Sequence, residues 1–188
     1  MSNTQRRRFL CTLFVLGIGL IAAVAASATT LVRLQFAELV HLANAIARGR
    51  CVSVETVMER GEIWTNTTFK ISETAKGELP ARIVIRQPGG KFLHVQSRVE
   101  GTPEFRVGEE AYLFLWGNSP HFTVLGWSQG TFRIRKNART RKETVTQDSA
   151  QTAIFDPQTK EFTQQGVRNL GVAIFREKIQ AELRRREQ

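Results

Sequence analysis

Cysteine is nearly absent from the sequence, and this scarcity excludes folds stapled by several disulfides. The 188 residues include two cysteines, Cys11 and Cys51, and Cys11 lies in an apolar segment near the start. If that segment is removed on export, Cys51 has no partner for an internal disulfide. A lone cysteine within a strand pattern favours a buried, inert thiol, although it could also cross-link two chains. The fold must therefore depend on an apolar core.

Histidines and catalytic motifs are also scarce. The three histidines fall on three different predicted elements, and none has a second ligand type at zinc spacing, so we predict neither a metal nor a cofactor. The sequence contains no G-x-S-x-G, P-loop or H-E-x-x-H motif. We therefore predict that the protein is not an enzyme. A site assembled from distant residues would have as its candidates Tyr112, His94, His121 and Glu110.

Acidic residues are outnumbered by basic ones, 17 against 27, which gives a formal net charge of +10. Residues 1–28 carry three arginines and no acid, so the remainder keeps a charge of about +7. A basic surface of this kind suits polyanions or acidic membrane surfaces as partners.

The first residues carry the pattern of an export signal. Arg6-Arg7-Arg8 precedes an apolar run over residues 9–26, and small residues follow. We predict a signal peptide over residues 1–28, cleaved between Ala28 and Thr29, and hence a periplasmic or extracellular protein. The alternative is an uncleaved anchor through residues 9–26, because about 18 apolar residues lie at the lower limit of a membrane span. The arginines fit both the twin-arginine and the general secretory route.

Period-two alternation dominates the middle of the chain. Before it, Phe36, Leu39, Val40 and Ala43 follow helical spacing and predict a short helix over residues 35–44. Turn signals about every ten residues then separate seven candidate strands, at 45–54, 63–72, 81–87, 91–101, 111–116, 121–127 and 131–136. This spacing predicts a mainly β fold, either a small barrel or a sandwich.

Two adjacent carboxylates, Glu109 and Glu110, stand before the very apolar stretch at 111–116. Consecutive residues of a strand point to opposite faces, so these two side chains cannot converge on one substrate atom. Paired-carboxylate catalysis requires both groups to flank one bond. We therefore interpret Glu109 and Glu110 as charges at the entry of a strand.

The last third of the chain changes in composition. Residues 137–169 are polar and basic, which predicts an exposed extension with a small hairpin near Asp156-Pro157. Residues 170–188 then hold an amphipathic helix, expected over about 170–186. This helix either packs on its own domain or docks on a membrane surface or partner through its terminal arginines. Its apolar positions are Leu170, Ile174, Phe175, Ile179, Ala181 and Leu183.

Three stretches resemble netrin-like domains and tissue inhibitors of metalloproteinases: "FAELVHLANAIARGRCVSVE", "TFKISETAKGEL" and "VGEEAYLFLW". The same order is also similar to exported bacterial proteins without an assigned function. The similarity covers about residues 35–136. It implies a small OB-type β-barrel over 29–136 and a binding role. The inhibitors begin with a zinc-chelating cysteine where this chain has Thr29, and Asn44 replaces their acidic residue, so the inhibitory mechanism is not carried over.

These observations lead to two hypotheses about function. The first is an exported binding module that engages an unidentified protein partner. The second is a binder of anionic polymers, either an acidic glycan or a single-stranded nucleic acid, which would use cations beside aromatic platforms. Its candidate ligand residues are Arg133, Arg135, Lys136, Arg139, Arg141, Lys142, Trp116 and Trp127.

Overall fold

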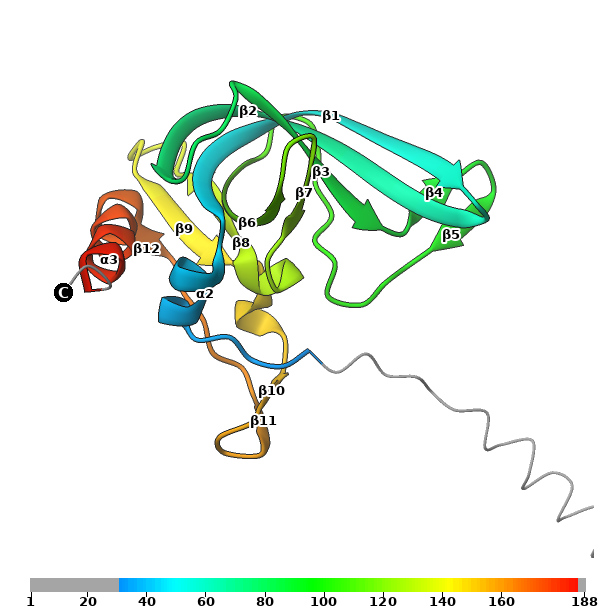
Figure 1. Ribbon diagram of the computed structural model, residues 1–188. Helices are drawn as coiled ribbons and strands as arrows, with labels where there is room; N and C mark the ends of the chain where they lie inside the picture. Colours follow the sequence, from blue (N-terminus) through cyan, green and yellow to red (C-terminus); the bar gives the residue numbers. More distant parts are fainter. Residues whose placement is uncertain (1–30, 186–188) are drawn as a thin grey trace, which may run out of the picture.

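The computed structural model describes residues 31–185 (Figure 1). The predicted signal peptide, its cleavage site at Ala28 and Thr29, and the alternative anchor over residues 9–26 lie outside the described residues. Within the described part, neither helix has the length and apolar character needed to cross a bilayer.

The fold is mainly β, as the alternation predicts, with one large sheet and two helices. The sheet has eight strands in the order β1-β2-β3-β7-β6-β8-β9-β12. Their bounds are β1 Ala45–Glu59, β2 Glu62–Lys76, β3 Arg82–Pro88, β6 Glu110–Asn118, β7 His121–Val124, β8 Thr131–Lys136, β9 Glu143–Gln147 and β12 Leu170–Gly171. The helices are α2 (Phe36–Leu42) and α3 (Val172–Arg185).

The sheet curls so that β1 pairs with β6 as well as with β2. Strands β1, β2, β3, β7 and β6 thereby form a circuit of hydrogen-bonded neighbours. The circuit is uneven, because β1 and β2 pair along nearly their whole length whereas β3 and β7 pair in parallel only at Val84↔His121 and Ile85↔Phe122. The far ends of β1 and β2 extend beyond the circuit as a long arm (Figure 1).

Strand β6 lies between two apolar clusters, which explains its uninterrupted apolar run. Leu113 and Leu115 point into the cluster enclosed by the circuit. Tyr112 and Phe114 point the other way, into a cluster that includes residues of α2 and α3. Figure 1 shows where these two helices lie. Because alternate residues of a strand face opposite sides, a strand buried on both faces must be apolar throughout. All four side chains are fully buried.

The predicted strand at 91–101 is wrong. The chain instead forms a tight hairpin of β4 (Gly90–Phe92) and β5 (Val95–Ser97), and Leu93 turns it with a positive φ of 53°. The stretch from Arg98 to Glu109 is a loop without regular structure. The alternating pattern in this region lacks enough apolar residues to hold a long strand against a core.

The predicted strand at 121–127 is too long, because β7 ends at Val124. Gly126 then adopts the left-handed conformation with a φ of 60°, and a 3-10 turn, η1 (Trp127–Gly130), follows. Glycine populates this region without the steric penalty of a Cβ atom, so the chain turns here.

The expectation of an exposed extension over residues 137–169 is also wrong in part. Strand β9 belongs to the main sheet and buries Val145 and Gln147. A 3-10 turn, η2 (Asp148–Gln151), and a hairpin of β10 (Ile154–Asp156) and β11 (Glu161–Thr163) follow. The threonine-rich β9 reads as polar, but β-branched residues in alternation are typical of a strand.

Helix α3 packs on its own domain largely through the predicted positions: Phe175 and Ile179 lie in the core cluster, and Leu183 packs against it. Val172, Phe175 and Ile179 are buried, whereas Ile174 is 54% exposed. Leu170 belongs to β12, one step before the helix. The spacing i, i+3, i+7 of the buried residues follows the helical period, and Ile174 falls outside that stripe.

Candidate functional site

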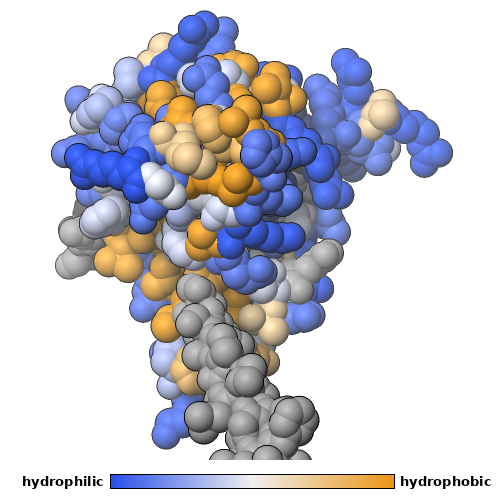
Figure 2. All heavy atoms as spheres, turned by 90° about the vertical axis from the view of Figure 1, so that its right-hand side faces the viewer, coloured by the Kyte–Doolittle hydropathy of each residue, from blue (hydrophilic) through white to orange (hydrophobic). Residues whose placement is uncertain are grey.

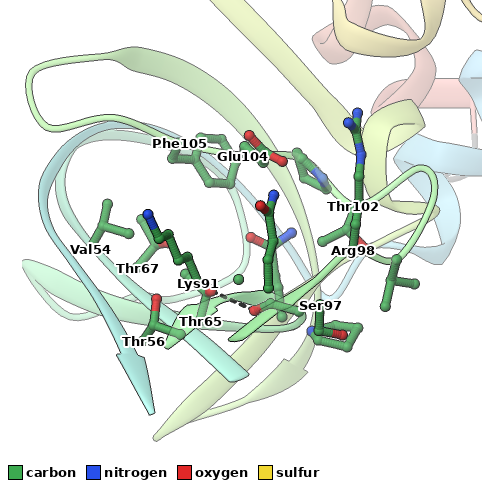
Figure 3. A pocket seen from close by; sticks show the side chains of 17 residues that line it. Val54, Thr56, Thr65, Thr67, Lys91, Ser97, Arg98, Thr102, Glu104 and Phe105 are labelled. Atoms are coloured by element: carbon green, nitrogen blue, oxygen red, sulfur yellow. Dashed lines mark hydrogen bonds between the residues drawn. The ribbon is translucent and has the colours of Figure 1, made fainter. Parts of the chain in front are cut away.

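A pocket lies where the β1-β2-β3 sheet continues beyond the circuit of strands. The β4–β5 hairpin and the loop that ends at Phe105 face this sheet across a space of about 240 Å³ (Figure 3). This volume is below the ~300–1,000 Å³ of most small-molecule pockets, so it suits a group of about one amino-acid residue.

The floor of the pocket consists of side chains from one face of three paired strands. The register places Val54 opposite Thr67, Thr56 opposite Thr65, and Thr65 opposite Gln87. Directly opposed residues share a face of the sheet. The pleat that sends Ile83 and Ile85 into the apolar cluster therefore sends Gln87 to the same side, at the edge of that cluster.

The β4–β5 hairpin is held close to this floor by two glycines. Thr65 donates a hydrogen bond of 2.6 Å from Oγ1 to the carbonyl oxygen of Gly89, drawn as a dashed line in Figure 3. Gly90 has a φ of 131°, and a Cβ atom there would collide with the Thr65 hydroxyl oxygen. A residue with a side chain would push the hairpin away, so glycine sets the depth of the pocket.

Two buried polar atoms of the lining lack a hydrogen-bond partner among the described residues. Gln87 is only 3% exposed, and its Nε2 atom is not paired. The Oγ1 atom of Thr102, in the facing loop, is likewise buried and unpaired. A buried polar group without a partner costs about 1–3 kcal/mol, so such groups mark places where a ligand or water supplies the missing bond.

The charged residues of the lining are mostly cationic. Lys91 reaches over the floor toward Val54 and Thr67, whereas Arg98 lies on the opposite side near Thr102 (Figure 3). Glu104 supplies one negative charge. Neither Lys91 nor Arg98 forms an ion pair with another residue of the described chain, so both ends of the pocket present cations to solvent.

Arg133, predicted as a ligand residue, instead fixes the loop that closes the pocket. Its Nε and Nη2 atoms donate to the carboxylate of Asp148 at 2.6 and 2.8 Å, and it also pairs with Glu109. Its Nη2 atom donates to the carbonyl oxygen of Glu104 at 2.6 Å, and the guanidinium lies 5.2 Å from the ring centre of Phe105. These bonds engage all three nitrogen atoms of its guanidinium.

The pKa values around Arg133 reflect this enclosed setting. Burial alone would lower the pKa of Arg133, but the hydrogen bonds and charges of Asp148 and Glu109 raise it above its ordinary value. Burial raises the pKa of Asp148, and the guanidinium only partly offsets that effect. Arg133, Asp148 and Glu109 therefore form a structural ion-pair cluster in which the charge of Arg133 is already paired.

The other predicted cations gather at the turn between β8 and β9. Register pairs Ile134 with Glu110, at the start of β6, whereas Trp116 is six residues further along β6, about 20 Å away at the usual strand rise. Trp127 lies at the opposite end of β8, against Gly101. The structure thus brings together the cations but not the aromatic platforms. The exposed cations at the end of β8 and in the turn after it are Arg135, Lys136, Arg139, Arg141 and Lys142.

Glu110 pairs with Arg48 and Arg50, on the neighbouring strand β1. Arg48 also bonds Glu143 of β9 at 3.0 Å, and this bond is the main cause that lowers the pKa of Glu143. Glu109, by contrast, pairs with Arg133. The two adjacent carboxylates therefore serve different ion pairs at the entry of β6.

The four residues considered for catalysis do not come together. Tyr112 is fully buried and donates to Glu73 at 3.0 Å, while its oxygen accepts from Arg176 at 3.0 Å. His121 begins β7, and His94 lies in the β4–β5 turn. In the described chain, no group of three or more His, Cys, Asp or Glu residues could hold a metal ion.

No family model, curated protein or solved structure matches the chain. Sequence reasoning missed Gln87 and Thr102, although one signal was present. Gln87 continues the inward series of Ile83 and Ile85, and a polar residue at such a core position is a departure from the binary pattern.

Proposed function

We propose that this chain is an exported, non-catalytic binding module built on an OB-type barrel, and that it engages a protein partner at the pocket between β3 and the loop ending at Phe105. The strand circuit β1-β2-β3-β7-β6-β1 supports the barrel, because a five-stranded, partly open Greek-key barrel has this size and closure. The netrin-like resemblance of residues 35–136 points the same way.

One observation carries the proposal: Gln87 is only 3% exposed, its amide nitrogen has no hydrogen-bond partner among the described residues, and it lines an open pocket. Other buried glutamines of the described chain are used differently. Gln129 accepts from the backbone nitrogen of Leu34 at 2.8 Å and donates to the carbonyl oxygen of Val32 at 2.9 Å. Among the buried glutamines of the described residues, Gln87 thus differs in having an amide nitrogen that an external partner could bond.

The surface around this end of the molecule favours a protein as that partner. Figure 2 views the side on which β4 and β5 lie and shows hydrophobic side chains gathered among hydrophilic ones. An apolar centre with a polar rim is the common anatomy of a protein interface. The elements of this end expose the large apolar side chains of Val52, Val54, Met58, Leu93 and Val95.

The test is a site-specific photo-crosslinking experiment with the full chain in an envelope extract. The crosslinking amino acid replaces Gln96, which is exposed and lines the pocket, and in a control it replaces Thr140, exposed in the β8–β9 turn. We expect a discrete protein adduct from position 96 that is absent from position 140. Identical adduct patterns at both positions would argue against this site.

The β8–β9 turn favours a second candidate function, binding of an anionic polymer. It concentrates five exposed cations within eight residues. A titration with single-stranded DNA and with an acidic polysaccharide distinguishes this function, because affinity for a polyanion falls steeply with salt. Replacement of Arg139, Arg141 and Lys142 by glutamine should then remove most of the salt dependence. Affinity unchanged by these replacements would contradict it.

A further inference from the structure

The chemistry of the pocket indicates which group of the partner it accepts, an inference that rests on the proposed function. The lining is rich in hydrogen-bond donors: the Gln87 amide, the Lys91 ammonium and the Arg98 guanidinium. An amide nitrogen, an ammonium and a guanidinium can only donate hydrogen bonds, so a group bound in the pocket must supply the acceptor atoms. Thr67 and Thr102 add hydroxyls that donate according to need.

Charge narrows the choice of ligand. Two cations and one carboxylate, Glu104, give the lining an excess of positive charge. Hydrogen bonds between charged partners are about twice as strong as neutral ones. A group that carries negative charge and only accepts hydrogen bonds therefore fits better than a neutral amide or hydroxyl.

Size and surroundings favour a carboxylate over a phosphate or a sugar. Neither α2 nor α3 lines the pocket, so it lacks the helix N-terminus that commonly binds phosphate. Its single aromatic residue, Phe105, is 7% exposed and packs edge-on against Phe69 with centroids 4.9 Å apart. That ring offers no open face on which a sugar could stack.

We infer that the pocket binds a carboxylate presented by the partner protein, an aspartate or glutamate side chain or a free C-terminus. Gln87 from the floor and Thr102 from the facing loop bond its oxygens, and Lys91 provides the opposing charge at the mouth. The pocket volume of about 240 Å³ accommodates one such residue.

The experiment uses the isotopically labelled full chain in NMR titrations. The probes are N-acetyl-glutamate N′-methylamide, its glutamine counterpart, N-acetyl-glycine as a C-terminal carboxylate, and glucuronate as an acidic sugar. We expect the glutamate probe, the glycine probe or both to shift the side-chain amide of Gln87 and to bind about tenfold tighter than the glutamine probe, as a charge-assisted bond implies.

Three variants make the titration decisive. Gln87→Met should abolish binding of the acidic probes, and Lys91→Gln should bring the glutamate probe to the affinity of its glutamine counterpart. Arg135→Gln, which removes an exposed cation at the end of β8, should change neither. The spectrum of each variant reports whether the fold is intact, so loss of binding is separated from loss of structure.

The outcomes separate this inference from the proposed function. Equal affinity for the glutamate and glutamine probes would overturn the inference that the pocket binds a carboxylate. A protein crosslinked at position 96 would still support the proposed binding module. If glucuronate binds more tightly than either peptide-like probe, the inference that the carboxylate belongs to a protein would be overturned, and a glycan would be favoured. If the acidic probes bind but no protein crosslinks at position 96, the proposal of a protein partner would be overturned, whereas the anion-binding site would be supported.

Discussion

Glu109 and Glu110 are neighbours in sequence whose carboxylates form ion pairs in different directions. Glu110 joins β6 to Arg48 and Arg50 of β1, whereas Glu109 joins the start of β6 to Arg133 of β8. Each pair lies where two strands meet. The roles of individual charged residues in this molecule thus follow from the strand that each side chain faces.

Tyr112 is the only tyrosine in the chain, so its ionisation can be followed without interference from another phenol. Burial raises its pKa, the hydrogen bond from Arg176 lowers it, and the charge of Glu73 raises it. We expect phenolate absorbance in the native protein to develop at higher pH than in the urea-unfolded chain, whose tyrosine titrates near pH ~10.

Variants of the two partners should move this titration in opposite directions. Arg176→Met removes a stabilising cation and should raise the pKa of Tyr112, and Glu73→Gln removes a repelling anion and should lower it. Since the folded-state pKa is raised, the contribution of Tyr112 to stability is fully present below the unfolded-state pKa and is lost as the pH rises from that value through the folded-state pKa. Coincident native and unfolded titration curves would contradict the buried setting.

A second prediction at the residue scale concerns the loop that Arg133 holds in place. Arg133→Gln removes the bonds to Asp148 and to the carbonyl oxygen of Glu104, so the loop from Pro103 to Phe105 should loosen. We expect faster amide hydrogen exchange in this loop and weaker binding of the acidic probe. Arg135→Gln, two residues further on the same strand, serves as the charge-matched control. Unchanged exchange in the Arg133 variant would show that the loop is held by other contacts.

At the scale of elements, β6 and α3 depend on each other for burial. Phe175 packs against Tyr112 and Phe132, with ring centroids 5.2 and 4.9 Å apart. Without α3, the outer face of β6 would expose aromatic side chains to water. Arg176 adds a polar tie, because it bonds Glu73 and the Tyr112 hydroxyl at the edge of this cluster.

Two substitutions one residue apart test which face of α3 is buried. Phe175→Ala should cost about 3–5 kcal/mol of unfolding free energy, because a large buried aromatic side chain is lost. Ile174→Ala, at a position 54% exposed, should cost less than about 1 kcal/mol. Urea denaturation at equilibrium measures both. Similar losses for the two variants would contradict the observed helix face.

Sequence patterns predicted some elements well and others poorly, for physical reasons. The run around Phe114 and Leu115 identified a deeply buried strand, because burial on both faces demands an apolar sequence. Strand β9 was missed, because one buried valine among threonines and a glutamine gives little hydrophobic contrast. The β4–β5 hairpin was taken for one strand, since the residue that turns it, Leu93, is not a typical turn former.

At the scale of the whole molecule, the candidate site depends on contacts between segments distant in sequence. Gln87 lies next to the end of β3, and Thr102 lies in a loop whose position depends on Arg133. A single sequence records no such convergence, so the pocket could not be located from spacing alone. The exposed cations at 135–142 were visible as a run, but their separation from Trp116 is a consequence of strand register.

At Gln87, we also expect the requirements of stability and binding to oppose each other. A binding site often holds groups that are unsatisfied in the free protein, so their removal can stabilise the fold. Gln87→Met deletes a buried, unpaired amide and replaces it with an apolar side chain of similar shape. We expect this variant to be as stable as the parent or more stable by up to about 1–2 kcal/mol, while probe binding and crosslinking at position 96 are lost.

Gln129→Met is the matched control for that prediction. Gln129 is equally buried at 3% exposed, but its amide bonds Leu34 and Val32. The same substitution there leaves backbone groups unpaired and should destabilise the protein by about 1–3 kcal/mol without changing the affinity of the acidic probe. Thermal and urea unfolding of both variants, with probe titrations alongside, give the comparison. If Gln87→Met destabilises as much as Gln129→Met, the amide of Gln87 has a structural partner and is not kept for a ligand.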